Sequence, residues 1–519
     1  MPDVLIIGGG HNALVAAFYL AKGGLKPLVL ERRAEAGGGA VTGELHPGFR
    51  CPTLSHEILL HDRIARDMGL ARHGLETLAA DVDVCAPSAG GPPLVIHEDP
   101  ARAAAALQRS DANDADAYGR YRAAVRGIAS VLAPLLEAPP PDIDRPGAAD
   151  LWNLLRAGRR FRALARQDQY RLLRWGPMPV ADLVGECFAG ERLRAAIAAP
   201  GLSGTMLGPR SAGSALVLLL REAHRHLAGG RRLQVRGGPG ELTRALAAAA
   251  QAAGAEIRTG TEVERIVVRD ERVAAVVANG REIDARRVVS GADPATTFLR
   301  LVDPLDLGPD FAAKMRNYRV RGTVAKVNLA LAGLPPFGVD AASLAGRIHI
   351  GPELDYLERA FDHAKYGELS AEPWLDIRLP TVLDPALAPA GAHVASIYVH
   401  YAPNRLRGAG WNDHRDRLIA VTLDVLERYA PGLRGQVLAA QAITPHDLEA
   451  EYGLAGGHPF HGELALDQLF TMRPLLGYGR YATPIRGLYM CGAGTHPGGF
   501  LTGASGRLAA RAILAARDI

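Results

Sequence analysis

Apolar residues near the start of the chain follow two different spacings. Residues 4–7 and 28–30 are short runs of Val, Leu and Ile, whereas residues 11–22 carry Ala and Leu at helical spacing. Short apolar runs predict buried strands, and the longer stretch predicts a helix. Gly8-Gly9-Gly10 separates the first run from the helical stretch, and Glu31 follows the second run. The pattern therefore predicts a strand, a glycine turn, a helix and a second strand.

The spacing changes again further along the chain. From residue 99 to about residue 225 it is largely helical, with a break at Pro139-Pro140-Pro141. Alternation typical of strands returns at 263–268, and Asn279-Gly280 predicts a tight hairpin between 273–278 and 281–289. We expect three more strands and a helix at 323–331, 374–379, 397–401 and 413–429 respectively. Strands and helices mixed in this way predict an α/β fold with an inserted region.

The first 31 residues also carry a chemical pattern. Gly8 suits a tight turn, Gly10 lets the backbone approach a pyrophosphate, and the small Ala13 lets the helix pack closely on the strand. The N-terminus of the helix presents unpaired N–H groups and a positive dipole end to phosphates. Glu31 can accept hydrogen bonds from a ribose diol. Together these features predict a dinucleotide site.

Two more glycine-rich stretches extend the predicted site. Gly37-Gly38-Gly39 follows Glu31 and suits a backbone that wraps around a cofactor, with Arg33 near enough to meet a phosphate or ribose; a flexible loop is the alternative. Glycines at 237–240 precede a predicted helix, and 492–499 join a strand to the last helix. The distant pair 237–240 and 492–499 fits one tightly held dinucleotide and leaves no seat for a second.

Composition bounds the class of protein. A chain of 519 residues predicts two or more domains, and 48% hydrophobic with 22% charged residues is ordinary for a globular protein. The net charge of +4 gives no argument for a nucleic-acid partner. The four cysteines form no CxxC, so a zinc site and a redox dithiol lack a basis, and no metal is expected. Without a long apolar run, we expect a cytoplasmic protein.

One helical stretch is unusually basic. Residues 156–174 carry many arginines with a single acid, Asp168, and Trp and Leu residues interleave with them from residue 151 onward. Arginines that meet lipid phosphates beside Trp and Leu are typical of a helix on a membrane surface. A solvated charged helix explains the same pattern. Peripheral membrane contact is therefore one of two open interpretations.

Motifs along nearly the whole length resemble one family. Residues 7–17, 460–470, Met472-Arg473-Pro474 and 494–499 are similar to the phytoene desaturase superfamily of FAD-dependent oxidoreductases. They are most like its branch of desaturase-type carotenoid ketolases and pyridine nucleotide-disulfide oxidoreductase domain-containing protein 2. Many relatives have an arginine where this chain has Gly39, so no arginine contact is assumed there.

The resemblance implies a fold and a cofactor. It implies FAD in a Rossmann-like domain of the amine oxidase type, formed by residues 1–75, 230–300 and 465–519. The inserted substrate domain comprises 76–229 and 301–464, with a mostly helical part at 100–225. The expected cofactor-binding residues are Gly8, Gly10, His11, Asn12, Ala13, Glu31, Arg32, Arg33, Gly38, Gly39, Ala40, Val263, Gly492, Gly494, Thr495, His496, Gly499, Leu501 and Thr502. His11 is expected to cap the first helix and His496 to shape its loop.

Four residues are candidates for catalysis. Lys326 lies in a strand that is otherwise almost without charge, on the face of Val324 and Asn328. The resemblance implies that it holds a water against flavin N5; a lysine that reaches solvent is the alternative. His461, Asp467 and Arg473 form a polar cluster in sequence that could line the flavin face or the substrate channel. A buried salt bridge between Asp467 and Arg473 is the competing interpretation.

These observations lead to a hypothesis with alternatives. The chain is expected to oxidise or desaturate an apolar, polyene-like or isoprenoid-like substrate by hydride transfer to flavin N5, with O2 or a quinone as acceptor. An amine-oxidase-like enzyme acting on a small polar substrate is the runner-up. A flavoprotein that acts as a regulator or scaffold without catalysis is the third. Oligomeric state stays open.

Overall fold

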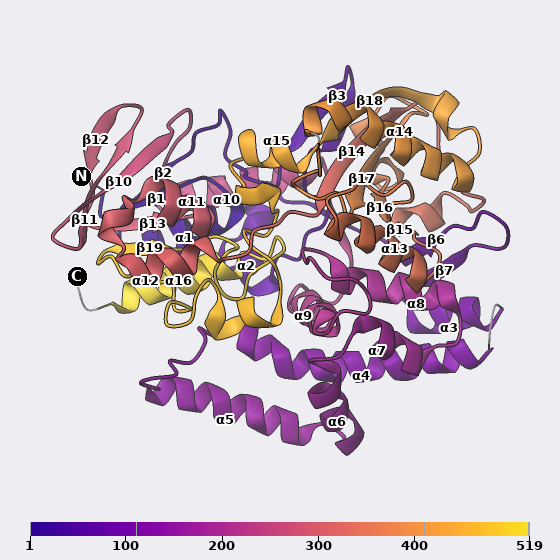
Figure 1. The fold of residues 1–519 in the computed structure, drawn as a ribbon, viewed down its shortest axis with the longest axis horizontal. Helices are drawn as coiled ribbons and strands as arrows, with labels where there is room; N and C mark the ends of the chain where they lie inside the picture. Colours follow the sequence, from indigo (N-terminus) through magenta and orange to yellow (C-terminus); the bar gives the residue numbers. More distant parts are fainter. Residues whose placement is uncertain (1, 110–111, 409, 517–519) are drawn as a thin grey trace.

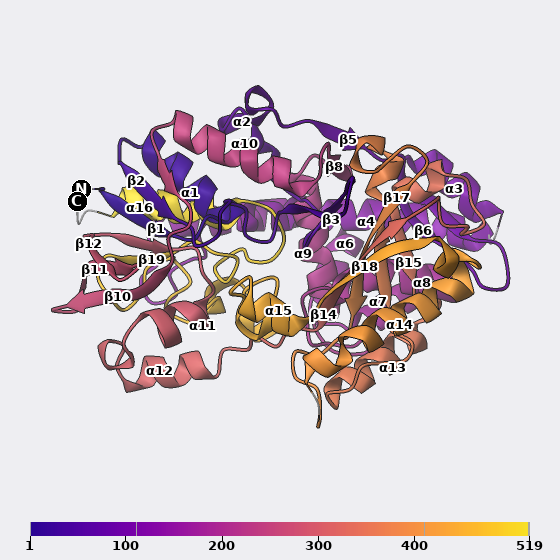
Figure 2. The same ribbon diagram turned by 90° about the horizontal axis from the view of Figure 1, so that it is seen from above.

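The computed structural model describes residues 2–109, 112–408 and 410–516, and it confirms the α/β fold. Its two large sheets lie in opposite halves of the molecule, and a layer of helices runs beneath them (Figure 1). Figure 2 shows the same separation from above, with the N-terminal strands on one side and β14 to β18 on the other.

The first half is built on a parallel sheet of five strands. Its order is β19-β13-β1-β2-β9, and every neighbouring pair is parallel. The strands are β1 (Val4–Ile7), β2 (Pro27–Leu30), β9 (Glu256–Arg258), β13 (Val288–Ser290) and β19 (Leu488–Met490). Helices α1 (His11–Lys22), α10 (Pro239–Ala252) and α16 (Ala504–Ala515) bury apolar residues in one cluster with Val4, Ile6 and Val29 of the sheet. The predicted strand–turn–helix–strand unit is confirmed, and distant segments complete its sheet.

A small antiparallel sheet continues this half. It comprises β10 (Val263–Arg269), β11 (Arg272–Ala278) and β12 (Arg281–Asp284). Asn279 and Gly280 have φ of 46° and 71°, as a two-residue hairpin of this kind requires. The hairpin predicted at these two residues is confirmed.

The second half is built on a mixed sheet of seven strands, in the order β18-β14-β17-β16-β15-β6-β7. Three predicted strands are confirmed here with shifted ends, and the predicted helix is α14 (Trp411–Tyr429). One sheet face is apolar and packs in a cluster with Leu418, Val425 and Leu426 of α14. The strands are β6 (Val82–Ala86), β7 (Leu94–His97), β14 (Val324–Leu331), β15 (Arg347–Ile350), β16 (Leu375–Arg378), β17 (His393–His400) and β18 (Val437–Ile443).

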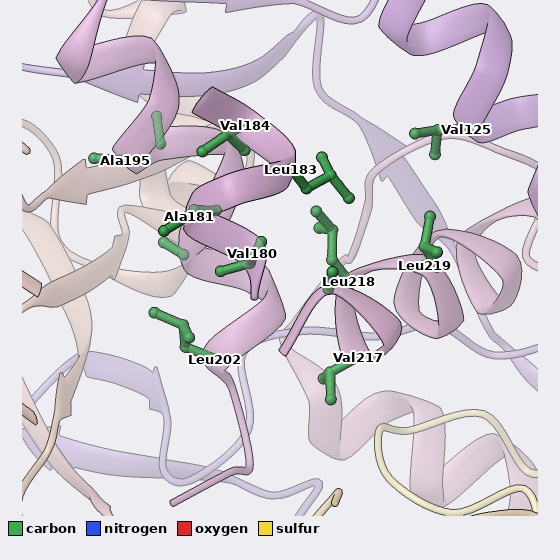
Figure 3. Close-up of a cluster of buried hydrophobic side chains, with 14 of the residues drawn as sticks. Val125, Val180, Ala181, Leu183, Val184, Ala195, Leu202, Val217, Leu218 and Leu219 are labelled. Carbon is green, nitrogen blue, oxygen red and sulfur yellow. The ribbon is translucent and has the colours of Figure 1, made fainter. Parts of the chain in front are cut away.

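The layer of helices comes from the stretch with helical spacing. It comprises α3 (Pro100–Gln108), α4 (Ala112–Leu136), α5 (Ala148–Ala163), α6 (Arg166–Trp175), α7 (Val180–Cys187), α8 (Glu191–Ala198) and α9 (Ser214–Leu227). Val125 of α4, Leu183 of α7 and Leu218 of α9 belong to one buried cluster (Figure 3). Helix α5 lies along the outer edge of this layer (Figure 1). The predicted helical region is confirmed.

Shorter elements link these parts. They are β3 (Thr42–His46), β4 (Phe49–Pro52), β5 (Thr77–Ala79), β8 (Leu233–Val235), α2 (Asp62–Asp67), α11 (Pro294–Thr296), α12 (Pro309–Arg316), α13 (Leu354–Lys365) and α15 (Pro445–Ala450). The parallel sheet draws its strands from the three segments expected for the cofactor domain. The bounds proposed for the two domains stay a prediction.

Candidate active site

A cavity of about 570 Å³ reaches from the parallel sheet to the seven-stranded sheet. One end is lined by Gly8, Gly10 and Glu31, which follow the carboxyl ends of β1 and β2. The other end is lined by residues of β14, β16 and β17. Ligands of open parallel sheets bind at the carboxyl ends of the strands, so the first end is the expected place for a dinucleotide.

Backbone geometry forms the dinucleotide end. Gly8 has φ of +85°, a conformation that side chains rarely adopt. The Gly9 N–H donates to Oε2 of Glu31 at 2.6 Å, and the Arg33 N–H donates to Oε1 of the same carboxylate at 2.9 Å. A Cβ on Gly38 would lie 3.0 Å from Cα of Gly10, so the two glycine segments touch through their backbones. Glu31 is thus held in place, and each oxygen keeps a lone pair for a ligand.

Unpartnered polar atoms at this end fit a bound pyrophosphate. Nη1 of Arg33 and Nε2 of His11 are buried without a hydrogen-bond partner, and both residues line the cavity. The Arg33 guanidinium lies 4.6 Å from the ring centroid of Tyr452, which fixes its position. Burial lowers the pKa of His11 to about 3, so its imidazole is neutral. The ring of His11 also bonds the backbone of Phe500, so the free Nε2 of this neutral imidazole is an acceptor for a ligand hydroxyl. The Arg33 cation and the helix N-terminus suit the phosphates of FAD, and Nε2 of His11 suits a hydroxyl group of the cofactor.

The structure brings most of the predicted cofactor residues to the cavity, but not all. The predicted residues that line it are Gly8, Gly10, His11, Asn12, Ala13, Glu31, Arg32, Arg33, Gly38, Gly39, Val263, Gly492 and Leu501. The predicted residues outside its lining are Ala40, Gly494, Thr495, His496, Gly499 and Thr502. His11 also differs from its predicted role, because α1 has no side-chain cap.

The residues outside the lining hold the loops that carry it. The hydroxyl of Thr495 donates to the carbonyl of Gly492 at 2.9 Å, and Nε2 of His496 lies 3.0 Å from the carbonyl of Leu135. A Cβ on Gly494 would lie 2.3 Å from Cδ of Pro294, so this turn packs tightly. These contacts hold the loop at 492–496 in place. His496 connects its loop to the end of α4, and its predicted role in shaping the loop stays a prediction.

The glycines at 237–240 also lie behind the cavity. The Gly240 N–H donates to the hydroxyl of Thr42 at 3.0 Å, and the Thr243 hydroxyl donates to the carbonyl of Ala40 at 3.0 Å. The start of α10 therefore supports the loop that follows Gly39 and does not line the cavity itself. Residues 237–240 were expected to form part of the cofactor site, and the structure gives them a supporting role instead.

Lys326 lies at the other end of the cavity. Its side chain is 2% exposed, so the alternative of a lysine that reaches solvent is wrong. Its ammonium donates to the hydroxyl of Ser396, lies 3.2 Å from Nδ1 of His56 and sits 4.7 Å from the ring centroid of Tyr398. Burial lowers the pKa of Lys326 to about 7, and burial together with the Lys326 charge lowers the pKa of His56. A proton can therefore be held or released here near neutral pH.

The cavity-facing side of the large sheet carries several polar side chains around Lys326. Tyr398 is the cross-strand neighbour of both Lys326 and Asp376, and His400 is the neighbour of Val324. Lys326, Asp376, Tyr398 and His400 line the cavity. Oδ1 of Asp376 is buried and has no hydrogen-bond partner in the part of the chain that the structure describes. Burial lowers the pKa of His400 to about 3, so it adds no charge.

Arg473 and Asp467 do not form the predicted buried salt bridge. The guanidinium of Arg473 is fully buried and donates to backbone carbonyls, including those of Phe460 at 2.8 Å and Ala493 at 2.8 Å. Asp467 accepts instead from Arg319, at 2.9 and 2.5 Å, and its side chain is 66% exposed. Neither residue lines the cavity. Both instead make contacts that hold the loop before the last strand. Their predicted catalytic role has no support from this placement.

His461 does line the cavity, unlike its two predicted partners. Its carbonyl accepts from the hydroxyl of Tyr318 at 2.9 Å, and its Nδ1 is buried without a partner. Burial lowers the pKa of His461. The residue is held through its backbone and leaves a ring nitrogen available to a ligand.

Sequence reasoning missed several lining residues. Phe460 and Phe500 have ring centroids 5.0 Å apart and form an apolar wall, and Asp376, Tyr398 and His400 form a polar one. The signal for the polar wall was present, because strands 375–378 and 393–400 place polar residues at alternate positions among apolar ones. The aromatic wall comes from loops, for which periodicity carries no signal.

Fold and site together define a class. A Rossmann-type sheet with a dinucleotide end, joined by one cavity to a second sheet with a buried lysine, suits an oxidoreductase that uses a dinucleotide cofactor. Residues 156–514 match the family described as flavin containing amine oxidoreductase, and residues 6–68 match the NAD(P)-binding Rossmann-like domain. The chain therefore belongs to the flavin containing amine oxidoreductase family.

Individual relatives agree with this assignment. The chain is 35% identical to pyridine nucleotide-disulfide oxidoreductase domain-containing protein 2 of Rattus norvegicus, over 100% of this chain and 94% of the relative. It is 29% identical to phytoene dehydrogenase of Streptomyces griseus, over 95% and 91%. Cyclohexylamine oxidase from Brevibacterium oxydans shares the fold, with a TM-score of 0.59 at 16% identity over 99% of this chain and 98% of that one.

These relatives confirm the resemblance to the phytoene desaturase superfamily. The protein is an FAD-dependent oxidoreductase, and FAD is its cofactor. The roles of the individual site residues stay proposals.

Proposed function

We propose that this enzyme oxidises a small organic substrate that has an apolar portion and an amine or hydroxyl group. The observation that carries the proposal is Oδ1 of Asp376 on the cavity wall, which is buried, accepts no hydrogen bond from the described residues and lies 4.0 Å from Nε2 of His56. A donor group on the substrate would satisfy this oxygen. Phe460 and Phe500, which line the same cavity, suit the apolar portion. This choice develops the amine-oxidase-like alternative, which expected a small polar substrate, by adding an apolar portion.

Energetics favour a substrate with a polar group. An apolar ligand against Asp376 would leave its buried Oδ1 without a hydrogen-bond donor. An unsatisfied buried polar group costs about 1–3 kcal/mol, and more when it is charged. A hydrogen bond to a charged group contributes about 1.5–3 kcal/mol instead. The difference selects for a substrate that presents a donor to Asp376.

FAD, when bound, supplies the acceptor for two electrons. Glu31, Arg33 and the N-terminus of α1 would hold its ribose and phosphates, and Lys326 lies at the other end of the same cavity. The chain's own part in the chemistry is proton handling and positioning. Lys326 Nζ, with a pKa lowered by burial to about 7, holds or releases a proton, while Ser396 and His56 fix its position.

Anaerobic mixing with candidate substrates tests this proposal. The flavin absorbance of the purified enzyme should bleach with amines or alcohols that carry an apolar group. Asp376→Asn should slow this reduction at least tenfold and leave the FAD content unchanged, because Asp376 lies at the substrate end. Bleaching by hydrocarbons alone, or an unchanged rate in Asp376→Asn, would contradict the proposal.

An apolar, isoprenoid-like substrate is the second candidate. The aromatic wall of Phe460 and Phe500 favours it, as does the similarity to a phytoene dehydrogenase. In this case the hydrocarbon alone should bleach the flavin and Asp376→Asn should have little effect. We further propose O2 or a quinone as the final acceptor, which oxygen uptake with and without a soluble quinone distinguishes.

We also propose peripheral contact with an anionic membrane through α5 and α6. Leu151, Trp152 and Leu155 of α5 are 57%, 59% and 52% exposed, and arginines on the same helix are exposed beside them. Apolar side chains with flanking arginines suit the boundary between acyl chains and headgroups. Among the described residues, no helix has the length and apolar character needed to cross a bilayer.

Vesicle co-sedimentation tests the membrane proposal. Vesicles that contain phosphatidylglycerol should carry the protein down, and pure phosphatidylcholine should carry much less. Arg156→Gln combined with Arg159→Gln should weaken binding, whereas the control Arg417→Gln on the exposed side of α14 should not. Equal sedimentation of the double variant and the control would remove the proposal.

A further inference from the structure

A second group of hollows lies beside the active-site cavity, behind Glu57. The inner hollow has a volume of about 50 Å³ and the outer one about 300 Å³. Arg225 and Arg231 line both hollows, so the two adjoin. Glu57 lines both the inner hollow and the active-site cavity. The hollows are therefore neighbours of the substrate end, but they are not part of the cavity already described.

Arginines dominate the walls of the inner hollow. Arg221 and Arg225 come from α9, Arg231 and Arg232 from the segment before β8, and Arg378 from β16. Three of these are ion-paired. Arg221 pairs with Glu57, Arg225 with Asp83 and Glu98, and Arg232 with Asp83 at 2.7 Å and Glu57 at 3.3 Å.

The other two arginines have no carboxylate within ion-pair distance among the described residues. Across the described residues, neither Arg231 nor Arg378 forms an ion pair, and Nε of Arg378 is buried without any hydrogen-bond partner. Burial and the nearby charge of Arg232 lower the pKa of Arg378 to about 9, and the more distant carboxylates of Asp376 and Glu57 offset this only in part. A guanidinium held in this way is stabilised by an anion, since charge-assisted hydrogen bonds to guanidinium are among the strongest in proteins.

We propose that the inner hollow binds a free small anion of carboxylate or phosphate chemistry, with Arg378 and Arg231 as its main ligands. The volume admits one such group, and the outer hollow, with exposed Arg231 at its edge, is the side from which it enters. The three ion-paired arginines add positive charge around the inner hollow. Arg378 supplies a planar fork of donors that matches two anion oxygens.

The site has a consequence for the active centre, which rests on the proposed role of Lys326. His56 lines the inner hollow, and its Nδ1 lies 3.2 Å from Nζ of Lys326. The charged groups that face Lys326 include Asp376 from β16, and the thiol of Cys51 from β4 is also near. An anion in the inner hollow would be separated from Lys326 by His56. Its negative charge favours the charged form of the lysine. Bound phosphate should therefore move the pH profile of flavin reduction toward higher pH.

Calorimetric titration of the FAD-loaded full-length protein with inorganic phosphate, and separately with acetate, tests the binding itself. FAD must be present so that phosphate does not occupy the pyrophosphate end of the cavity. At constant ionic strength we expect one saturable site. Arg378→Gln should weaken it at least tenfold, and the control Arg316→Gln on the exposed side of α12 should not.

Two outcomes would overturn the proposal: no saturable binding of either anion by the wild type, or equal binding by Arg378→Gln. If Arg378→Gln fails to fold, the exposed Arg231→Gln takes its place, with the same tenfold expectation. Binding needs no turnover, so its failure is distinguishable from failure of the proposed oxidation. Binding with an unchanged pH profile would support the site and refute only its link to Lys326.

Discussion

Replacing Lys326 by Met removes an ammonium that is buried on the cavity face of β14. Burial lowers the pKa of this side chain from 10.5 to about 7, and its side chain is 2% exposed. A difference of this size corresponds to about 5 kcal/mol of destabilisation by the charged form. In the unfolded chain, Lys326 stays protonated up to the ordinary pKa of a lysine. The free-energy cost of its buried charge in the folded protein is therefore present in full below about pH 7 and disappears as the pH rises toward 10.5.

Lys326→Met should therefore be more stable than the wild type at low pH and nearly equal to it at high pH. For a chain of 519 residues, about 5 kcal/mol corresponds to about 4 °C in melting temperature. Met fills a similar volume beside Tyr398, and His56 keeps its contact with Ser396 at 3.0 Å. The assay is the melting temperature of both FAD-loaded proteins at about pH 6, 8 and 10.

Lys365→Met is the matched control, because Lys365 lies on the surface of α13 with a side chain that is 42% exposed. It should not reproduce this pH-dependent gain in stability. The reasoning is refuted if the difference between Lys326→Met and the wild type stays constant with pH. It is also refuted if Lys326→Met melts below the wild type at about pH 6, where the buried charge costs most.

Three further substitutions test the rest of the site. Gly38→Val places a Cβ 3.0 Å from Cα of Gly10 at φ of +57°, so it should weaken FAD binding by about 1–2 kcal/mol in a fluorescence titration; unchanged affinity would contradict the close approach. Glu31→Gln should weaken FAD binding by about 1–3 kcal/mol, because its carboxylate accepts from the Gly9 N–H at 2.6 Å. Arg473→Met leaves buried loop carbonyls unpaired and should destabilise the protein by about 3 kcal/mol, seen as a lower melting temperature. Equal melting temperatures would refute the supporting role of Arg473.

Local patterns made much of the fold predictable. The unit from Val4 to Glu31 is encoded by residues that are neighbours in sequence, and the hairpin at Asn279-Gly280 depends on two adjacent conformations. The strands at 324–331 and 375–378 were visible because one face is continuously apolar. Such features need no information about distant segments.

The neighbours of Lys326 could not be predicted from local sequence patterns. Its neighbours are His56, from the loop after β4, and Ser396 and Tyr398, from a strand far along the chain. Their meeting depends on sheet order and register, which alternation alone does not specify.

The error at Asp467 has the same origin. The residue lies close in sequence to Arg473, but the fold brings Arg319 to it. Arg473 turns inward to loop carbonyls instead, a partner set without a sequence signal. Sequence spacing predicts ion pairs within a helix, because the geometry of a helix is known. It does not predict them in loops.

The FAD content of the purified protein tests the central claim most directly. Protein prepared in the presence of FAD and then freed of excess cofactor should be yellow and should release one FAD per chain on denaturation. Gly38→Val should release less FAD after the same removal of excess cofactor, since its Cβ would lie 3.0 Å from Cα of Gly10. A colourless wild-type protein that takes up no FAD on reconstitution would contradict the account.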